Sequence, residues 1–332
     1  LTANTIGDRN TALGWSAMAT NVDGDRNVAI GYGAMQTFEP SNTATYNTAV
    51  GYVAGNAMTT AINNTFIGGL ANAIGVPGNQ NTAVGSQAMY NNADVENTGI
   101  GYAALNANTS GGYNTAVGSN VMSANTTGDS NVAVGQNALD ANTTASNNVA
   151  IGAAALGANT TGTNNVMVGN SAGDAITTSN NNTGVGHDVL GANTSGDTNT
   201  AMGSTTLNTN TTGSGNTGVG YAALTANTSG ASNVAVGSSA LQANTTAADN
   251  VAVGYQALLT NTTGAENTSV GSFSMNLNTT GSYNSAFGRL ALRVNTTGIQ
   301  NTAIGYQALA ANTTASNNSA FGYNALVLNT TG

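Results

Sequence analysis

The chain has 332 residues, of which only 5% are charged, and it contains neither cysteine nor lysine. Four arginines against thirteen acidic residues give a net charge of −9. Surfaces that bind nucleic acid or anionic membranes need clustered Lys and Arg, so we expect neither partner. Without cysteine there are no disulfides and no thiolate metal sites. The sequence has no run of about eighteen apolar residues, so we expect no membrane insertion.

A short segment, Asn-Thr-Ala-Val-Gly with close variants, recurs in nineteen copies, and its Asn is taken here as position 0 of a repeat. Sixteen of the eighteen intervals are seventeen residues long. The others are twenty, between Asn27 and Asn47, and sixteen, between Asn81 and Asn97. Stacked repeats tolerate added residues only where the backbone leaves the stack, so the insertion that includes 38–40 marks a turn between positions 8 and 16.

Each repeat is predicted to begin with a strand of about five residues, from 11–15 and 28–32 at the N-terminal end to 302–306 and 319–323 at the other. Such segments are bounded by Asn and Gly turn signals, whereas a helix would need sustained apolar residues at i, i+3, i+4 and i+7. Two strands fit in one seventeen-residue coil. We therefore expect an all-β, parallel β-solenoid (β-roll or β-helix) of about nineteen coils, with 1–332 forming one repetitive shaft.

Two large apolar residues per coil are expected to face the interior. Position 3 is Val, Ile, Leu, Met or Phe in every copy, and position 8 is Leu or Met in sixteen, failing at Gly55, Asn72 and Gly173. Parallel stacking places each position above its own copy. The predicted interior rows contain Val117, Val134 and Ile151 at position 3, and Leu139, Leu156 and Leu190 at position 8.

The turn after position 8 contains Asn at position 11, followed by two hydroxyl residues and then Gly at position 14. Identical Asn side chains stacked at strand spacing form an amide ladder that satisfies buried polar groups. Gly128 and Gly162 are expected to supply a positive φ at the bend. The predicted ladder members are Asn125, Asn142, Asn159, Asn244 and Asn261.

The repeat resembles those of two families of surface fibres. The segments at 81–85 and 148–152 look like the signature of trimeric autotransporter adhesin heads, which are parallel β-rolls with usually shorter repeats. The longer unit at 301–314 resembles repeats of phage-type tail fibres and related bacterial surface fibres. The resemblance covers the whole chain and implies a homotrimeric or bundled extracellular rod.

Isolated polar residues give little indication of catalysis or metal binding, and we expect no enzyme activity and no cofactor. His187 occupies position 5, which elsewhere is Tyr, Ser, Gln or Arg, so it is interpreted as a surface side chain. Asp23 and Asp25 flank Gly24 as in a calcium loop, but calcium-binding solenoids repeat their carboxylates at one position. Here the acids are scattered, which argues against structural calcium.

Aromatic residues at position 5 are the candidates for a partner surface, because exposed rings can contact a ligand and buried rings can pack between subunits. Those singled out are Trp15, Tyr32, Tyr102, Tyr255 and Tyr306. The Asn-Thr-Thr triplets match the N-glycosylation pattern, although their recurrence favours a structural origin. Rows of Thr at positions 12 and 13 resemble ice-binding solenoids, but adjacent residues point to opposite faces of a strand.

Both ends of the sequence fall within a repeat, at Leu1 and Gly332, so we expect a segment of a longer protein or a unit that stacks into a filament. The sequence favours a structural or adhesive fibre shaft that extends a binding tip from a cell or virion surface. An ice- or surface-binding solenoid and a self-assembling matrix filament are the alternatives. The expected partners are further copies of the chain and, through domains beyond it, a cell-surface receptor or glycan.

Overall fold

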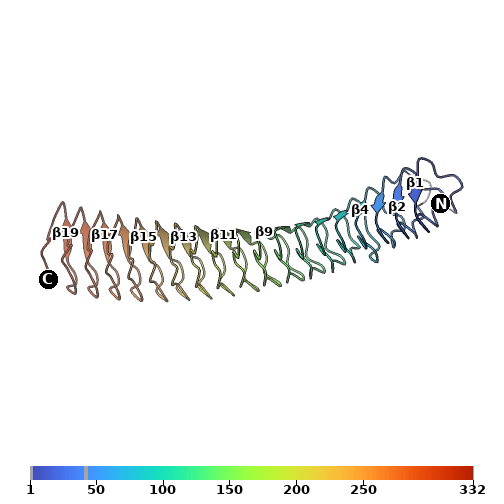
Figure 1. Ribbon diagram of the computed structural model, residues 1–332. Helices are drawn as coiled ribbons and strands as arrows, with labels where there is room; N and C mark the ends of the chain where they lie inside the picture. The colour runs from blue at the N-terminus through green and yellow to red at the C-terminus, as the bar shows by residue number, and fades with distance from the viewer. Residues whose placement is uncertain (1–2, 41–43, 332) are drawn as a thin grey trace. The chain divides into compact units, whose positions relative to one another are not determined.

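The protein is all-β in the part that the computed structural model describes, residues 3–40 and 44–331, where no helix occurs (Figure 1). It contains nineteen parallel strands of three residues each, one per coil, which confirms the predicted all-β, parallel β-solenoid. The chain divides into two compact units, Leu1–Asn165 and Val166–Gly332. The termini Leu1 and Gly332, where the sequence is cut within a repeat, lie outside the described residues.

The first unit contains β1 (Thr11–Leu13), β2 (Val28–Ile30), β3 (Thr48–Val50), β4 (Thr65–Ile67), β5 (Thr82–Val84), β6 (Thr98–Ile100), β7 (Thr115–Val117), β8 (Val132–Val134) and β9 (Val149–Ile151). The second contains β10 (Val166–Val168), β11 (Thr183–Val185), β12 (Thr200–Met202), β13 (Thr217–Val219), β14 (Val234–Val236), β15 (Val251–Val253), β16 (Thr268–Val270), β17 (Ser285–Phe287), β18 (Thr302–Ile304) and β19 (Ser319–Phe321).

Within each unit, every strand pairs in parallel with the same three positions of the next coil. Val117 of β7 lies beside Val134 of β8, which is seventeen residues later. The register survives the insertion, where Val28 pairs with Thr48, and the deletion between β5 and β6. The strand register is therefore unaffected by either irregular interval. Phe38 of the insertion is fully buried, and 41–43, which follow it before β3, lie outside the described residues. At about 4.8 Å per strand, β1–β9 span about 40 Å.

The strands are shorter than predicted because of the glycine at position 4. Gly118 has a φ of 137°, a conformation that L side chains rarely adopt, and the chain turns away directly after Val117. The rest of the coil consists of turns rather than the expected second strand. Three further residues of a typical coil are left-handed without being glycine, at positions 6, 8 and 16, such as Asn120, Met122 and Ser130.

The predicted interior row at position 3 is wrong. Val117 and Val134 are only half-buried and Ile151 is 39% exposed, whereas the preceding Ala150 is fully buried. Side chains alternate across a strand, so positions 0 and 2 share one face and positions 1 and 3 the other. The Asn at position 0, such as Asn148, is fully buried. The amide and the small alanine therefore take the inner face, and the large residue faces outward.

The predicted interior row at position 8 lies inside. Leu139, Leu156 and Leu190 have no solvent exposure, and neither do Ala138 and Ala155 at position 7 before two of them. The interior of a coil thus contains one large apolar side chain, with alanines around it. This thin interior explains why position 2 is usually alanine.

Two of the three failures at position 8, Gly55 and Gly173, are compensated by a large residue on the strand side. Phe66 at position 2 is fully buried and lies against Gly55 of the preceding coil, where an added Cβ would be 2.9 Å from the ring. The same coil as Phe66 has Asn72 at position 8. Met167 at position 2 similarly lies against Gly173, 3.1 Å from the position of an added Cβ. Large residues at position 2 therefore occur where position 8 is not Leu or Met.

The amide ladder at position 11 has the predicted geometry. The side-chain nitrogen donates to the Oδ1 of the Asn one coil earlier in most of the consecutive copies, at 2.7 Å from Asn142 to Asn125 and 3.0 Å from Asn261 to Asn244. Asn159 and Asn244 donate in the same way at 3.2 and 2.9 Å. The ladder ends where an apolar residue takes the position. Buried Asn21 Oδ1, for instance, has no partner, and the next coil has Phe38 at position 11.

A second amide ladder, at position 0, was not predicted. The Oδ1 of Asn114 accepts hydrogen bonds from the backbone nitrogen of Asn131 at 3.0 Å and from its Nδ2 at 3.2 Å. The Nδ2 of Asn131 also donates to the carbonyl oxygen of Ala145 at 2.9 Å. The same carbonyl accepts from Asn142 of the first ladder at 3.1 Å. Position 14 thus joins the two ladders within one coil.

This role corrects the expectation for glycine at position 14. Neither Gly128 nor Gly162 has a left-handed φ. The carbonyl oxygen of Gly128 accepts from Asn114 at 2.8 Å and Asn125 at 3.1 Å, and alanine does the same at Ala145. Glycine at 128 is favoured by close packing and not by a left-handed φ, because an added Cβ would collide with the backbone carbonyl oxygen of Ala145 in the next coil and lie 2.6 Å from Asn125 Oδ1.

Candidate functional site: the outer rows of the coil

The surface of the described residues has no enclosed site. No pocket is detected in 3–40 and 44–331. In the same ranges, no group of three or more His, Cys, Asp or Glu could hold a metal ion, and no helix is long and apolar enough to cross a membrane. The candidates for function are therefore the rows of side chains that the coils present to solvent.

His187 lies on the outside of a turn beside two acids. Its Nδ1 is 3.2 Å from Asp188 Oδ2, and the histidine side chain is 59% exposed. Partial burial, together with the charge of Asp188, raises the pKa of Asp174 above its ordinary value. The three side chains form a solvated surface group, consistent with the interpretation of His187 as a surface residue.

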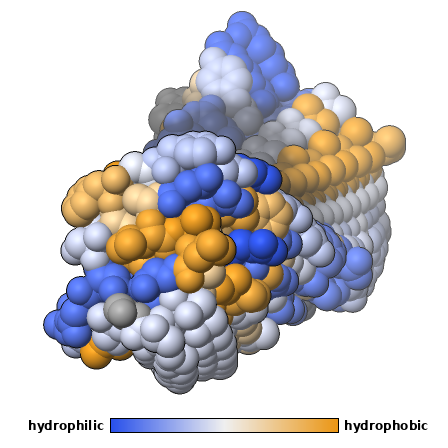
Figure 2. Space-filling view, turned by 90° about the vertical axis from the view of Figure 1, so that its left-hand side faces the viewer, coloured by the Kyte–Doolittle hydropathy of each residue, from blue (hydrophilic) through white to orange (hydrophobic). Residues whose placement is uncertain are grey.

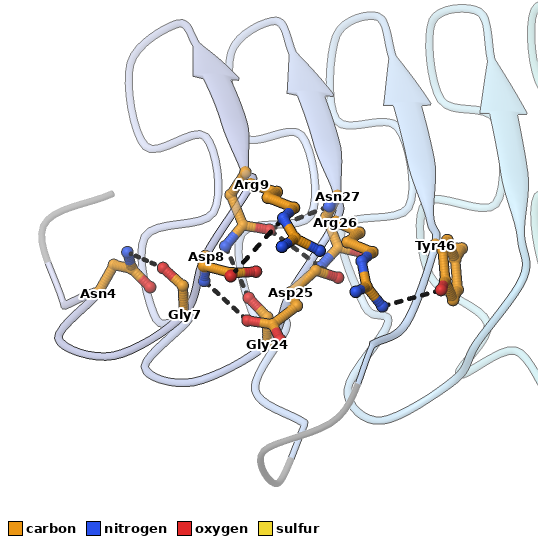
Figure 3. A network of polar contacts seen from close by, with 10 residues as sticks. Asn4, Gly7, Asp8, Arg9, Gly24, Asp25, Arg26, Asn27 and Tyr46 are labelled. Carbon is orange, nitrogen blue, oxygen red and sulfur yellow. Dashed lines mark hydrogen bonds and ion pairs between the residues drawn. The ribbon is translucent and has the colours of Figure 1, made fainter.

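The acids near position 15 bond to the coil stack. Asp25 Oδ1 accepts a hydrogen bond of 2.7 Å from the backbone nitrogen of Asp8, one coil earlier (Figure 3). Asp129 and Asp197 accept from the corresponding nitrogens of their preceding coils, at 2.8 and 2.6 Å. Each carboxylate satisfies a backbone N–H that the strand ladder does not reach.

Serine performs the same task in other coils. Ser146 Oγ accepts from the backbone nitrogen of Asp129 at 2.9 Å, and Ser214 Oγ from that of Asp197 at 3.0 Å. A hydroxyl can replace a carboxylate as a hydrogen-bond acceptor but is a poor substitute in a calcium site, where ligand charge sets affinity. The Asp-Gly-Asp segment at 23–25 is thereby explained through Asp25 as a coil-to-coil contact.

The arginines near the N-terminal end are held on the surface by neighbours in their own or the next coil. Arg9 Nε is 3.7 Å from Asp8 Oδ2. Arg26 donates from Nη1 to the Tyr46 hydroxyl at 2.8 Å, and its guanidinium lies 5.3 Å from the ring centroid (Figure 3). Exposed contacts of this kind contribute little to stability, and the group has no cavity that would receive a ligand.

The aromatic residues of position 5 stack on each other along the coils. Trp15 and Tyr32 have ring centroids 4.9 Å apart, and Tyr32 and Tyr52 are 5.5 Å apart, both pairs nearly parallel. Tyr306 stacks in the same way on Tyr323 at 5.2 Å. Stacking covers the inner ring faces, so these rows present mainly ring edges and hydroxyls to a partner. Trp15 and Tyr32 are exposed.

Tyr102 and Tyr255 are also exposed. Tyr255 contacts Phe273 of the next coil edge-to-face at 5.2 Å. The aromatic residues predicted as partner-facing thus all lie outside the coil. Each of them occupies position 5 of its own coil, so within a unit they follow a row along the coils and do not surround a common site.

The outer face of the strands is the surface that the sequence interpretation missed. Position 3 residues point outward, and several of them are more than a third exposed: Leu13, Ile67, Ile100, Ile151, Val185, Met202, Val236, Phe287, Ile304 and Phe321. Position 1 beside them is Thr, Val or Ser in every copy. Figure 2 shows apolar side chains following one another in rows along the molecule. The alternation rule applied from a buried Asn at position 0 would have indicated this face.

The Thr rows of the turn are ordered by bonds between coils. At position 12, Thr211 Oγ1 donates to the carbonyl oxygen of Thr228 at 3.0 Å, and Thr228 to that of Thr245 at 3.0 Å. The neighbouring position 13 residues, such as Thr212 and Thr246, are exposed. One of the two Thr rows therefore stabilises the stack and the other faces solvent.

The glycosylation triplets at position 11 have buried acceptor amides, since Asn125 and Asn261 are fully buried in the ladder. The same pattern, Asn-Asn-Thr or Asn-Asn-Ser, begins at position 16 in three coils with an exposed first Asn, at Asn63, Asn181 and Asn317. Burial in the amide ladder thus gives the position 11 triplets a structural role, as the sequence interpretation favoured, whereas the three position 16 triplets have an exposed acceptor Asn.

The chain matches no protein-family model and no curated protein.

Proposed function

We propose that the chain is the shaft of an extracellular fibre, a passive spacer that holds a binding tip away from a cell or virion surface. The supporting observation is that most coils are joined to the next by the same bonds. In the second unit, Asn227 bonds to Asn210 at 2.8 Å, Asn233 to Asn216 at 3.1 Å and Thr228 to Thr245 at 3.0 Å. Stability that comes from neighbours alone gives length without a unique site.

The proposed shaft is a homotrimer or another bundle of copies, located outside the cell. The thin interior supports association, because a coil with one large buried side chain gains little from its own core. The resemblance of the repeat to surface and tail fibres favours the extracellular location. Neither enzyme activity nor a bound cofactor is part of this proposal.

Deletion of two whole coils tests the spacer role. Removing 199–232 joins position 16 of one coil to position 0 of another, so every ladder can re-form. We expect the full chain without these residues to keep its circular dichroism spectrum and its denaturant midpoint. Its maximum dimension in small-angle X-ray scattering should fall by about 10 Å, the height of two strands.

A deletion of 199–207 is the control, because it shifts the repeat out of register and should unfold the neighbouring coils. Unfolding after the two-coil deletion would contradict the proposal, since a spacer made of interchangeable coils tolerates changes in their number.

Ice binding by the Thr rows is a second candidate. The observation in its favour is the fixed orientation of the position 12 hydroxyls, which places exposed Thr of position 13 at regular strand spacing. Thermal hysteresis of the unmodified chain and of the variant Thr212→Lys, Thr246→Lys, Thr280→Lys decides between the two functions. Arrest of ice growth that is lost in the variant would support ice binding, whereas a spacer leaves ice growth unchanged.

A further inference from the structure

We propose that the outer strand face, positions 1 and 3 of successive coils, packs against the same face of a second copy of this chain. The inference rests on the proposed homo-oligomeric shaft and names the surface that assembles it. It replaces the aromatic row of position 5 as the main contact, because those rings already stack within their own chain at 4.9–5.5 Å.

The chemistry of the face indicates an apolar partner. Position 3 is large and apolar in all nineteen coils, and neither position 3 nor position 1 carries a charge in any of them. In β10–β19, Met202 is 46% exposed and Phe287 40%. A row of exposed side chains that is apolar in every coil indicates a surface that is covered by a partner and shielded from water.

The net charge of −9 does not oppose this contact. The acids of the second unit lie at turn positions, for example Asp174 at position 9, Asp197 at position 15 and Asp249 at position 16. Two copies that meet through their strands keep these charges toward solvent. A contact through the turns would instead bring like charges together.

The regular spacing of the face points to another copy as the occupant. Side chains at position 3 repeat once per coil, and parallel strands stand about 4.8 Å apart. A partner stays in step over many coils only if it has the same period, which a second copy has by construction. Residues of different size at position 3, from Val219 to Met202 and Phe287, make the face uneven, which favours a deformable protein surface over a flat ice lattice.

Each unit supplies part of the area that a stable contact needs. Three residues of a strand span about 10 Å, so strands about 4.8 Å apart present about 430 Å² in the first unit, with nine strands, and about 480 Å² in the second, with ten. Stable protein interfaces bury about 800 Å² on each partner, which contacts through both units together would reach.

Sedimentation velocity of the full chain at micromolar concentration tests the proposal with two matched variants. The face variant is Met202→Lys, Val236→Lys, Val270→Lys, in alternate coils. The control variant is Thr212→Lys, Thr246→Lys, Thr280→Lys, which adds the same charge to the same three coils at exposed turn positions. We expect the unmodified chain and the control to sediment as oligomers. The face variant should sediment as a monomer, and its circular dichroism spectrum should show that it is folded.

A milder face variant, Met202→Thr, Val236→Thr, Val270→Thr, keeps β propensity and covers the case in which the lysines prevent folding. It should weaken association at least tenfold while the chain stays folded. A monomeric unmodified chain, or a face variant that assembles as well as the control, would overturn the proposal. Arrest of ice growth that only the face variants lose would overturn it in favour of an ice-binding face. The two-coil deletion measures the length and folding of the chain and not its association, so it tests the spacer role independently of this contact.

Discussion

Phe66 and Gly55 share one space in the interior, since a Cβ added to Gly55 would be 2.9 Å from Cδ2 of the Phe66 ring. A large residue on the strand wall of one coil fills the room that a missing leucine leaves on the turn wall of its neighbour. The two positions are therefore coupled across coils, and each residue is understandable only with the other.

This coupling predicts a non-additive pair of substitutions. Gly55→Leu alone should destabilise by about 1–3 kcal/mol through overpacking, and Phe66→Ala alone by about 3–5 kcal/mol through a cavity. The double variant reproduces the usual alanine and leucine pair and should lose much less than the sum. A left-handed φ does not prevent Leu at position 8, since Leu139 has a φ of 50°. Hydrogen exchange of the flanking coils measures the effect.

Gly69→Leu is the control for this cycle, because an added Cβ there meets nothing within 4 Å. Additive effects of the two single substitutions would show that Phe66 and Gly55 do not share the space.

The amide ladder predicts a large loss from a single truncation. Asn227 donates to Asn210 Oδ1 at 2.8 Å and to Gly230 O at 2.9 Å, and accepts from Asn244 at 2.9 Å. Asn227→Ala removes three buried bonds and leaves partners unsatisfied, so we expect a loss of about 2–4 kcal/mol. Denaturant unfolding followed by circular dichroism gives the value. The exposed Ser229→Ala in the same turn should change it by less than about 0.5 kcal/mol.

The position 15 acids should respond to substitution as acceptors and not as metal ligands. Asp197→Ser keeps an oxygen for the backbone nitrogen of Asn180, as Ser214 does for that of Asp197. Asp197→Ala removes it and should cost about 1 kcal/mol in the free energy of unfolding. A chelator added to the unmodified chain should leave the denaturant midpoint unchanged. A lower midpoint in chelator would show instead that the carboxylates hold a cation.

Asp174 predicts a weak pH dependence of stability. Burial and the charge of Asp188 raise its pKa in the folded chain above the ordinary value of 3.8. A raised folded pKa means that the folded state binds the proton more tightly, so this contribution is present at pH below 3.8 and is lost as pH rises through the folded pKa. Asp174→Asn should therefore raise the unfolding midpoint at pH 7 and have no benefit near pH 3. An equal benefit at both values would exclude the charge as the cause.

The sequence was sufficient for the fold because the seventeen-residue period determines parallel stacking before any side chain is considered. It also identified the ladder at Asn125 and Asn142, where identical amides recur in one turn. It failed at Val117 because size was taken as a sign of burial. The smaller Ala116 and the polar Asn114 fill the interior instead, since two such amides satisfy each other across coils.

The outer strand face was missed for the same reason. Position 3 residues such as Val236 were assigned to the interior and were therefore not considered as a contact surface. The compensation between Phe66 and Gly55 could not be predicted either. It joins residues on opposite walls of neighbouring coils, and only the packing shows that these walls touch.

The rungs of the Asn ladders, described above as sources of stability, also determine how the chain would yield under tension. Each rung joins only adjacent coils, so a pulling force peels one coil from the stack before it loads the next. Most events would release seventeen residues, about 60 Å of extended chain. Because the coils would unfold one after another at similar forces, a tether built in this way would lengthen under shear while most of its coils stay folded.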